Sequence, residues 1–179
     1  MKTIFIISGD EGTGKSSLIK SITTILQKYN HTILGYRTIY NEPTNCFSIQ
    51  MLQNDEKFLF TGRWDQFQRK SNHVKFIRKA LELENDRVRN LNYKKSLIVT
   101  IDEIGCYELE GKVLHNIFTE LVQLLLPLII TTKNEYLPAV IKKWNLNPAA
   151  VFYQFEFSEP EKIVFQIERM IKLCKEQNL

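Results

Sequence analysis

Residues 4–16 read IFIISGDEGTGKS, and they decide the fold of this chain. The run from Ile4 to Ser8 is apolar and rich in β-branched residues, which predicts a buried strand that ends at Gly9. After the following loop, apolar residues at helical spacing predict a helix that begins near Lys15. These apolar residues are Leu18, Ile22, Ile25 and Leu26. A strand, a glycine-rich loop and a helix in this order are the setting of a phosphate-binding loop.

The loop over residues 9–16 fits the pattern G-x-x-x-x-G-K-[ST], the Walker A motif. Its glycines let successive backbone N–H groups turn towards phosphate oxygens, and the helix N-terminus adds its dipole. We expect Lys15 to act as a catalytic residue on the β and γ phosphates, and Ser16 to bind Mg²⁺. The alternative is a glycine-rich turn that only caps a helix. The residues expected to bind the phosphates are Gly9, Asp10, Glu11, Gly12, Thr13, Gly14, Lys15, Ser16 and Ser17.

A second motif lies at residues 97–105, which read LIVTIDEIG. Ligands of an open parallel sheet bind at the carboxyl ends of its strands, so Asp102 is expected at that edge, holding Mg²⁺ through water. The adjacent Glu103 is expected to polarise a water molecule as a catalytic residue, whereas an enzyme with an organic acceptor would exclude water. A carboxylate pair in an ordinary turn is the alternative.

Strands that alternate with helices along the chain predict an α/β fold of the P-loop NTPase type, a mostly parallel sheet with helices on both faces. Residues 47–51 and 57–60 are expected to form an antiparallel hairpin at one sheet edge. Asn134 is expected to cap a helix that carries Pro138 in its first turn. The five expected core strands are 2–8, 33–40, 96–102, 128–132 and 151–157. The expected helices are 15–30, 65–91, 112–125, 134–144 and a last one around 163–174.

The position of the Asp-Glu strand, third of the five, favours one strand order. It suits the P-loop branch in which the fourth strand separates the third from the first. In that order Thr131 or Thr132 would end the fourth strand beside the γ-phosphate. A short polar strand end is the other explanation.

Composition and length indicate one globular domain over residues 1–179. The chain is 44% hydrophobic and 25% charged, close to the globular average, which excludes collagen-like and largely disordered proteins. We expect neither an export signal nor a membrane span. Its three cysteines, Cys46, Cys106 and Cys174, suggest neither a disulfide framework nor a zinc site. A cytoplasmic location is therefore expected.

Positive charge is concentrated in residues 61–95, which hold ten Lys and Arg against four Asp and Glu. The solvated face of a surface helix accounts for such a segment, and a site for phosphate-bearing ligands is the alternative. Nucleic acid is the weaker partner, because aromatic residues do not alternate with the basic ones here. We expect a monomer that binds a nucleoside triphosphate and no membrane. A protein partner stays open.

Three segments of the chain resemble the THEP-type small P-loop nucleoside triphosphatases, which include the cancer-related NTPases. They are the segment 4–19, the Gly-aromatic pair Gly35-Tyr36 in a predicted strand, and IVTIDEIGCYELE at 98–110. The resemblance implies Mg²⁺-dependent hydrolysis of NTPs to NDP and phosphate with poor base discrimination. It also implies that Glu108 is a site carboxylate.

One departure from that family concerns positive charge at the site. The family commonly carries Asn-Arg near the start of its final helix, whereas residues 157–162 here contain no arginine and offer only Lys162. Because an arginine finger contributes roughly 10³ to 10⁵ in rate, we expect slow hydrolysis by this chain alone.

The sequence thus predicts a Mg²⁺-dependent phosphohydrolase that acts on ATP, GTP and other nucleoside triphosphates. Two alternatives remain open. One is a kinase of a nucleotide or small metabolite, in which the basic segment binds the acceptor. The other is an ATP-binding switch without turnover.

Overall fold

The structure is a computed structural model that describes residues 3–41, 46–51, 57–60, 97–112, 114–154 and 159–176. The helix predicted over 65–91, the basic segment 61–95 and the predicted end of the last strand, 155–157, lie outside these residues. The described strands are β1 (Ile4–Ser8), β2 (Thr32–Asn41), β3 (Cys46–Met51), β4 (Lys57–Phe60), β5 (Leu97–Asp102), β6 (Leu128–Thr132) and β7 (Ala150–Tyr153). The described helices are α1 (Lys15–Lys28), α3 (Cys106–Leu109), α4 (His115–Gln123), α5 (Leu137–Lys143) and α6 (Pro160–Glu176).

The described strands form one sheet in the order β4-β3-β2-β5-β6-β1-β7. From β2 to β7 all neighbours are parallel, and β3 and β4 extend the sheet beyond β2 as an antiparallel hairpin. The predicted α/β class and edge hairpin are confirmed. So is the strand order, because β6 lies between β5 and β1.

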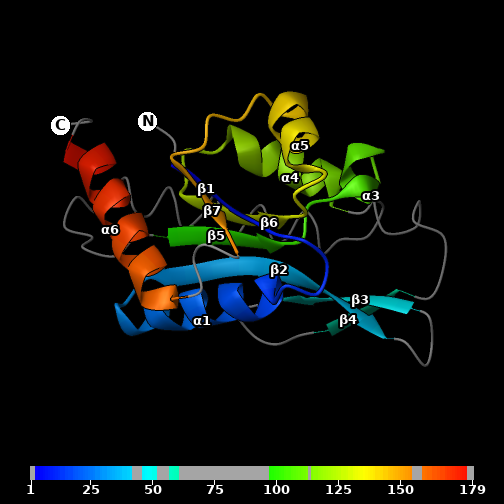
Figure 1. The fold of residues 1–179 in the computed structure, drawn as a ribbon, viewed down its shortest axis with the longest axis horizontal. Coiled ribbons are helices and arrows are strands. Elements are labelled where there is room, and N and C mark those ends of the chain that lie inside the picture. The colour runs from blue at the N-terminus through cyan, green and yellow to red at the C-terminus, as the bar shows by residue number, and fades with distance from the viewer. Residues whose placement is uncertain are drawn as a thin grey trace.

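Helices cover both faces of this sheet (Figure 1). The alternating side chains of β1 show how the core is divided: Phe5 and Ile7 pack towards α1 and α6, whereas Ile4 and Ile6 pack towards α4 and α5. All four side chains are buried, and burial of one such side chain contributes about 1.5–3 kcal/mol. Two apolar layers therefore hold the carboxyl ends of β1, β5 and β6 in place.

Gly35 in β2 is required by the close approach of its neighbour β5. A Cβ atom built on Gly35 would lie 1.9 Å from the carbonyl oxygen of Thr100. The two residues are partners in the parallel register of β2 and β5. Because the obstacle is backbone rather than a flexible side chain, no other residue fits here without moving a strand.

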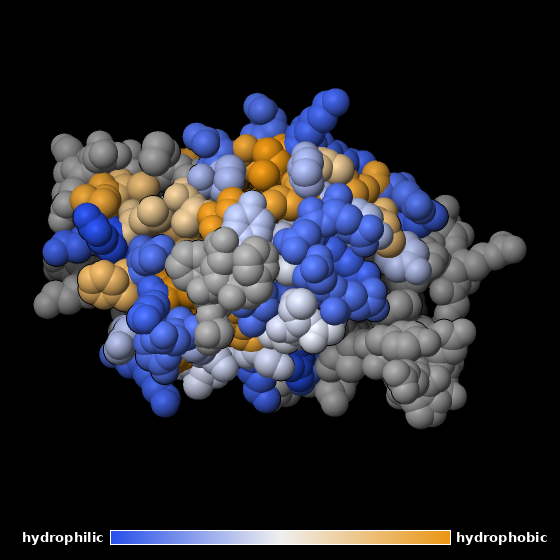
Figure 2. Space-filling view, in the orientation of Figure 1, coloured by the Kyte–Doolittle hydropathy of each residue, from blue (hydrophilic) through white to orange (hydrophobic). Residues whose placement is uncertain are grey.

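Helix α6 is amphipathic. Its inner face buries Ile163, Ile167 and Ile171, while Phe165 and Leu173 are exposed. Figure 2 shows apolar and charged residues mixed over this helix at the left of the view. Among the described residues, no helix has the length and apolar character needed to cross a membrane.

The start of the helix after β6 differs from its prediction. Helix α5 begins at Leu137, and Tyr136 occupies the capping position without a side-chain hydrogen bond. The prediction that Asn134 caps this helix is wrong, because the Asn134 amide is bonded to Ser8 and Asp10 instead. Pro138 does lie in the first turn of α5, as predicted.

Candidate functional site

The loop between β1 and α1 has the backbone shape that its glycines permit. Gly12 and Gly14 have positive φ angles of 73° and 88°, a region that residues with a Cβ atom rarely adopt. Gly14 is followed directly by Lys15, the first residue of α1, so the free N–H groups of the first turn point into the loop. The predicted phosphate-binding residues, Gly9 to Ser17, thus lie together around one helix N-terminus.

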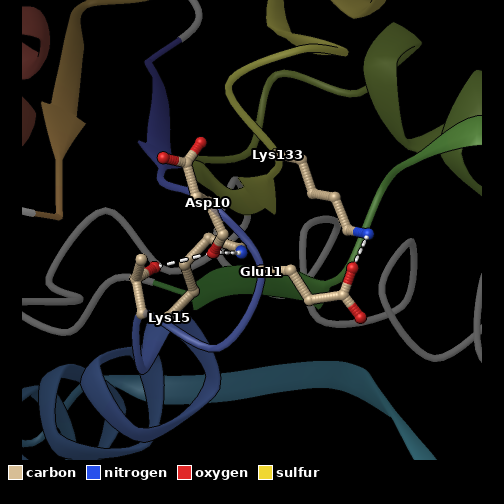
Figure 3. Close-up of polar contacts among 5 residues, drawn as sticks. Asp10, Glu11, Lys15 and Lys133 are labelled. Carbon is tan, nitrogen blue, oxygen red and sulfur yellow. Dashed lines mark hydrogen bonds and ion pairs between the residues drawn. The ribbon is translucent and has the colours of Figure 1, made fainter.

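Lys15 is the buried cation of this loop. Its side chain is 6% exposed, and its Nζ donates a hydrogen bond of 2.8 Å to the Asp10 carbonyl oxygen. Thr13 Oγ1 donates to the same oxygen at 2.8 Å (Figure 3). The Asp10 carbonyl oxygen therefore holds the Lys15 ammonium over the loop. When an anion binds there, the ammonium can exchange this carbonyl oxygen for the anion.

Asp102 ends β5 and is 1% exposed. Its Oδ1 accepts a hydrogen bond from Thr131 Oγ1, whereas Oδ2 is buried and has no hydrogen-bond partner among the described residues. Burial raises the pKa of this carboxyl, and the Thr131 and Ser16 hydroxyls and the Lys15 ammonium act to lower it. Asp102 Oδ2 thus makes no hydrogen bond of ordinary geometry to the described part of the chain, although the Ser16 hydroxyl is close enough to this carboxyl to lower its pKa.

The Asp102 carboxylate and the Ser16 hydroxyl suit a hard cation that prefers oxygen ligands. Mg²⁺ is commonly held by one or two protein oxygens together with substrate phosphates and water. Among the described residues no three His, Cys, Asp or Glu side chains gather as a metal site, so Ser16 and Asp102 would have to act together with phosphate oxygens. The donor set therefore fits Mg²⁺ bound to a nucleotide.

Glu103 follows Asp102 through a cis peptide bond and is partly buried. Burial raises the pKa of its carboxyl. The Lys15 and Lys133 ammonium groups lower this pKa and Asp102 raises it, so all three charges are close enough to act on it. Glu103 is thus a carboxylate at the edge of the loop with increased basicity.

Glu108, the site carboxylate implied by the family resemblance, has backbone partners. Its Oε2 accepts the Gly105 N–H at 2.9 Å, and its Oε1 accepts the Leu114 N–H at 3.3 Å. Burial raises the pKa of this carboxyl to about 7. The Glu108 contact with Gly105 caps the N-terminus of α3, a one-turn helix that the sequence analysis did not predict. In its described contacts Glu108 holds the turn after Glu103 and does not touch residues 9–17.

The sequence analysis missed the role of the segment after β6. Ser8 Oγ donates to Asn134 Oδ1 at 2.7 Å, and Asn134 Nδ2 donates to Asp10 Oδ1 at 2.9 Å. Lys133 Nζ lies 2.7 Å from Glu11 Oε2 (Figure 3). The predicted strand order was the available signal, because it brings the residues after 132 next to the end of β1.

Arg37 was also missed. In the register of β2 and β5 it is the partner of Asp102, and its positive charge lowers the pKa of that carboxyl. Its Nε donates to Gln50 Oε1 on β3 at 2.8 Å. The hairpin thus holds a guanidinium group near the buried carboxylate.

The two threonines predicted near the γ-phosphate behave differently. Both are fully buried at the end of β6. Thr131 bonds to Asp102, whereas the Thr132 hydroxyl has no hydrogen-bond partner among the described residues.

Comparison with known proteins assigns the family. A sequence model of the NTPase family matches residues 4–168, nearly the whole chain. The chain belongs to this NTPase family. A search of the curated proteins finds no match.

A solved structure shares the fold of this NTPase. It is the crystal structure of THEP1 from the hyperthermophile Aquifex aeolicus, with a TM-score of 0.62 and 20% sequence identity over 96% of this chain and 98% of that one. The family match and this common fold confirm the resemblance to THEP-type P-loop NTPases.

Proposed function

We propose that the protein hydrolyses nucleoside triphosphates, ATP and GTP among them, to the diphosphate and inorganic phosphate with Mg²⁺. The observation that carries the proposal is the convergence of Lys15, Asp102 and Glu103 at the mouth of one glycine-rich loop. Charge effects on pKa link these three side chains to one another. The family match over residues 4–168 supports a nucleotide substrate.

Lys15 and the backbone N–H groups of the loop bind the phosphates. On binding, the Lys15 ammonium leaves the Asp10 carbonyl oxygen for phosphate oxygens, and it balances negative charge in both the bound and the transition state. Ser16 and Asp102 would hold Mg²⁺, with the buried Oδ2 of Asp102 as the ligand atom of that carboxyl. Bound Mg²⁺ supplies positive charge to the phosphate oxygens.

Glu103 acts as the general base. Its carboxylate accepts a proton from a water molecule while the water oxygen forms a bond to the γ-phosphorus. The bond from phosphorus to the β–γ bridging oxygen breaks in line, and the nucleoside diphosphate and phosphate leave. A carboxyl pKa raised by burial makes the group a stronger base for this step.

Glu108 has a positioning role in this proposal. It fixes the backbone of the turn that follows Glu103 through the N–H groups of Gly105 and Leu114. We carry over from the family resemblance that the protein discriminates poorly between the nucleobases of its NTP substrates. We also propose that the protein is a monomer, consists of one domain and is located in the cytoplasm.

Phosphate release measured over a panel of NTPs, with and without nucleotide or metabolite acceptors, tests the function. We expect release without an acceptor and a loss of release when Mg²⁺ is removed. Phosphate transfer that needs an acceptor would indicate a kinase. Nucleotide that remains bound without turnover would indicate a switch.

A further inference from the structure

Lys133 brings a second ammonium group to the mouth of the loop. It directly follows β6, and its Nζ lies 2.7 Å from Glu11 Oε2 at the exposed tip of the loop. Its positive charge also lowers the pKa of Glu103. Figure 3 shows Lys133 beside Glu11 at the loop tip, and the charge of the same side chain acts on the proposed general base, Glu103.

The backbone on both sides of Lys133 is fixed. Before it, the Thr131 carbonyl oxygen accepts the Ile104 N–H at 2.9 Å and the Thr132 carbonyl oxygen accepts the Gly9 N–H at 3.3 Å. After it, the Asn134 amide is bonded to Ser8 and Asp10. The Cα atom of Lys133 is thus held against the loop, while its side chain ends in an exposed ion pair.

The Lys133–Glu11 ion pair costs little free energy to break. The Glu11 side chain is 84% exposed and the Lys133 side chain 24%, and exposed ion pairs contribute little net stability. A triphosphate in the loop would bring several negative charges close to the same ammonium group. The phosphate is then the stronger partner, because it carries more charge than one carboxylate.

Other described cations are less suited to the γ-phosphate. Arg37 acts on the pKa of Asp102, and its Nε is bonded to Gln50 on β3. Lys162 in α6 is paired with Glu159, the residue just before that helix. Lys133, in contrast, is paired with the loop tip through Glu11, and its charge acts on Glu103.

We propose that Lys133 is a catalytic residue that replaces the missing arginine. When a triphosphate fills the loop, the Lys133 ammonium leaves Glu11, contacts the γ-phosphate and stabilises the negative charge that develops there as the bond to the leaving diphosphate breaks. Lys133 transfers no proton in this step. The inference rests on the proposed hydrolysis and names the cation that assists it.

Two substitutions that break the same ion pair provide the test. Lys133→Ala should lower kcat on the order of 10²- to 10³-fold, the loss seen when one preorganised donor is removed from a transition state. Glu11→Gln should act in the opposite direction and lower KM for Mg·ATP by about two- to fivefold, because it frees Lys133 and removes a negative charge beside the phosphates. Lys112→Ala, which breaks the exposed pair between Lys112 and Glu110, is the matched control and should leave both constants unchanged.

Binding measurements separate a catalytic role from a structural one. Calorimetry should give Lys133→Ala an affinity for Mg·ADP within about twofold of the wild type, but at least about a tenfold loss of affinity for Mg·ADP with aluminium fluoride, a mimic of the transition state. Lys133→Arg should restore part of kcat. If Lys133→Ala does not fold, Lys133→Gln keeps the long side chain without its charge and takes its place.

Equal changes of kcat and KM in Lys133→Ala and Glu11→Gln would overturn the catalytic role of Lys133. A purely structural ion pair is broken by either substitution, so both variants would then behave alike. An unchanged affinity of Lys133→Ala for the fluoride complex would also overturn that role. A wild-type protein that hydrolyses no NTP would overturn the proposed function itself. An active wild type with an inert Lys133 would overturn the present inference alone.

Discussion

The Thr131 hydroxyl donates a hydrogen bond to Asp102 Oδ1, and this bond joins the carboxyl ends of two neighbouring parallel strands. Both side chains are buried. The bond supports the ionised form of a carboxyl whose burial favours the neutral form. The proposed metal ligand is therefore oriented by the adjacent strand before any metal binds.

Substitution of Thr131 should weaken this arrangement. Thr131→Val keeps the shape and removes the donor, so stability should fall by about 1–3 kcal/mol in thermal or urea unfolding. The pKa of Asp102 should rise, because a hydrogen bond to the ionised form is lost, and the acid side of the pH–rate profile should move to higher pH. Thr132→Val is the control for stability, since the Thr132 hydroxyl has no described partner to lose. Equal losses of stability in the two variants would contradict this account.

Lys15→Ala should weaken triphosphate binding and hydrolysis together. The ammonium contacts phosphate oxygens in the ground state and in the transition state, so both KM and kcat should worsen. Calorimetric titration with Mg·ATP and a phosphate-release assay check this. Normal activity in this variant would remove the phosphate-binding role from the loop.

Glu103→Gln should separate binding from turnover. An amide keeps the shape of the carboxylate but cannot accept a proton, so kcat should fall on the order of 10²-fold or more while Mg·NTP binding is retained. Asp102→Asn should instead raise the Mg²⁺ concentration needed for half-maximal rate. A Glu103→Gln enzyme with normal kcat would assign water activation to another group.

Glu108 should make the stability of the protein depend on pH. Its folded-state pKa of about 7 lies above the ordinary glutamate pKa of 4.5, so its contribution to stability is fully present below about pH 4.5 and is lost as the pH rises to about 7 and above. The loss is on the order of 2–4 kcal/mol. Urea unfolding of the wild type and of Glu108→Gln between pH 5 and about 8 measures it. The slope assigned to Glu108 should disappear in the variant, and an unchanged slope would contradict the prediction.

Gly35→Ala should destabilise the sheet strongly. The added Cβ atom meets the Thr100 carbonyl oxygen at 1.9 Å, and relief requires β2 to move away from β5. A loss of about 2–4 kcal/mol is expected in thermal unfolding. Gly105→Ala is the control, because its Cβ would meet the nearest atom at an ordinary 3.6 Å. A stable Gly35→Ala protein would show that the strands can adjust.

The features that sequence predicted are those encoded by local pattern. The phosphate-binding loop was recognisable because glycines, Lys15 and a strand-to-helix change occur within a few residues. The edge hairpin could likewise be predicted from two short strand segments close together in the sequence, and the strand order from the position of the Asp-Glu strand as the third of five. The Asp102–Glu103 pair was found because it directly follows an apolar strand.

Contacts between distant residues were not predictable in this way. Asn134 bonds to residues about 125 positions earlier, and its preference for helix caps suggested a local role instead. Arg37 and Asp102 meet only because β2 and β5 are register partners. Helix α3 is too short to show a helical period, and its N-terminal cap depends on the buried carboxylate of Glu108.

The bridge from Ser8 through Asn134 to Asp10 has a consequence for the entropy of substrate binding. A loop that is disordered in the free protein loses backbone freedom each time a ligand orders it, and this loss weakens binding. Here the segment after β6 is bonded to the phosphate-binding loop before a ligand arrives. Its ordering takes place once, during folding, so each binding event need restrict only side chains such as Lys133.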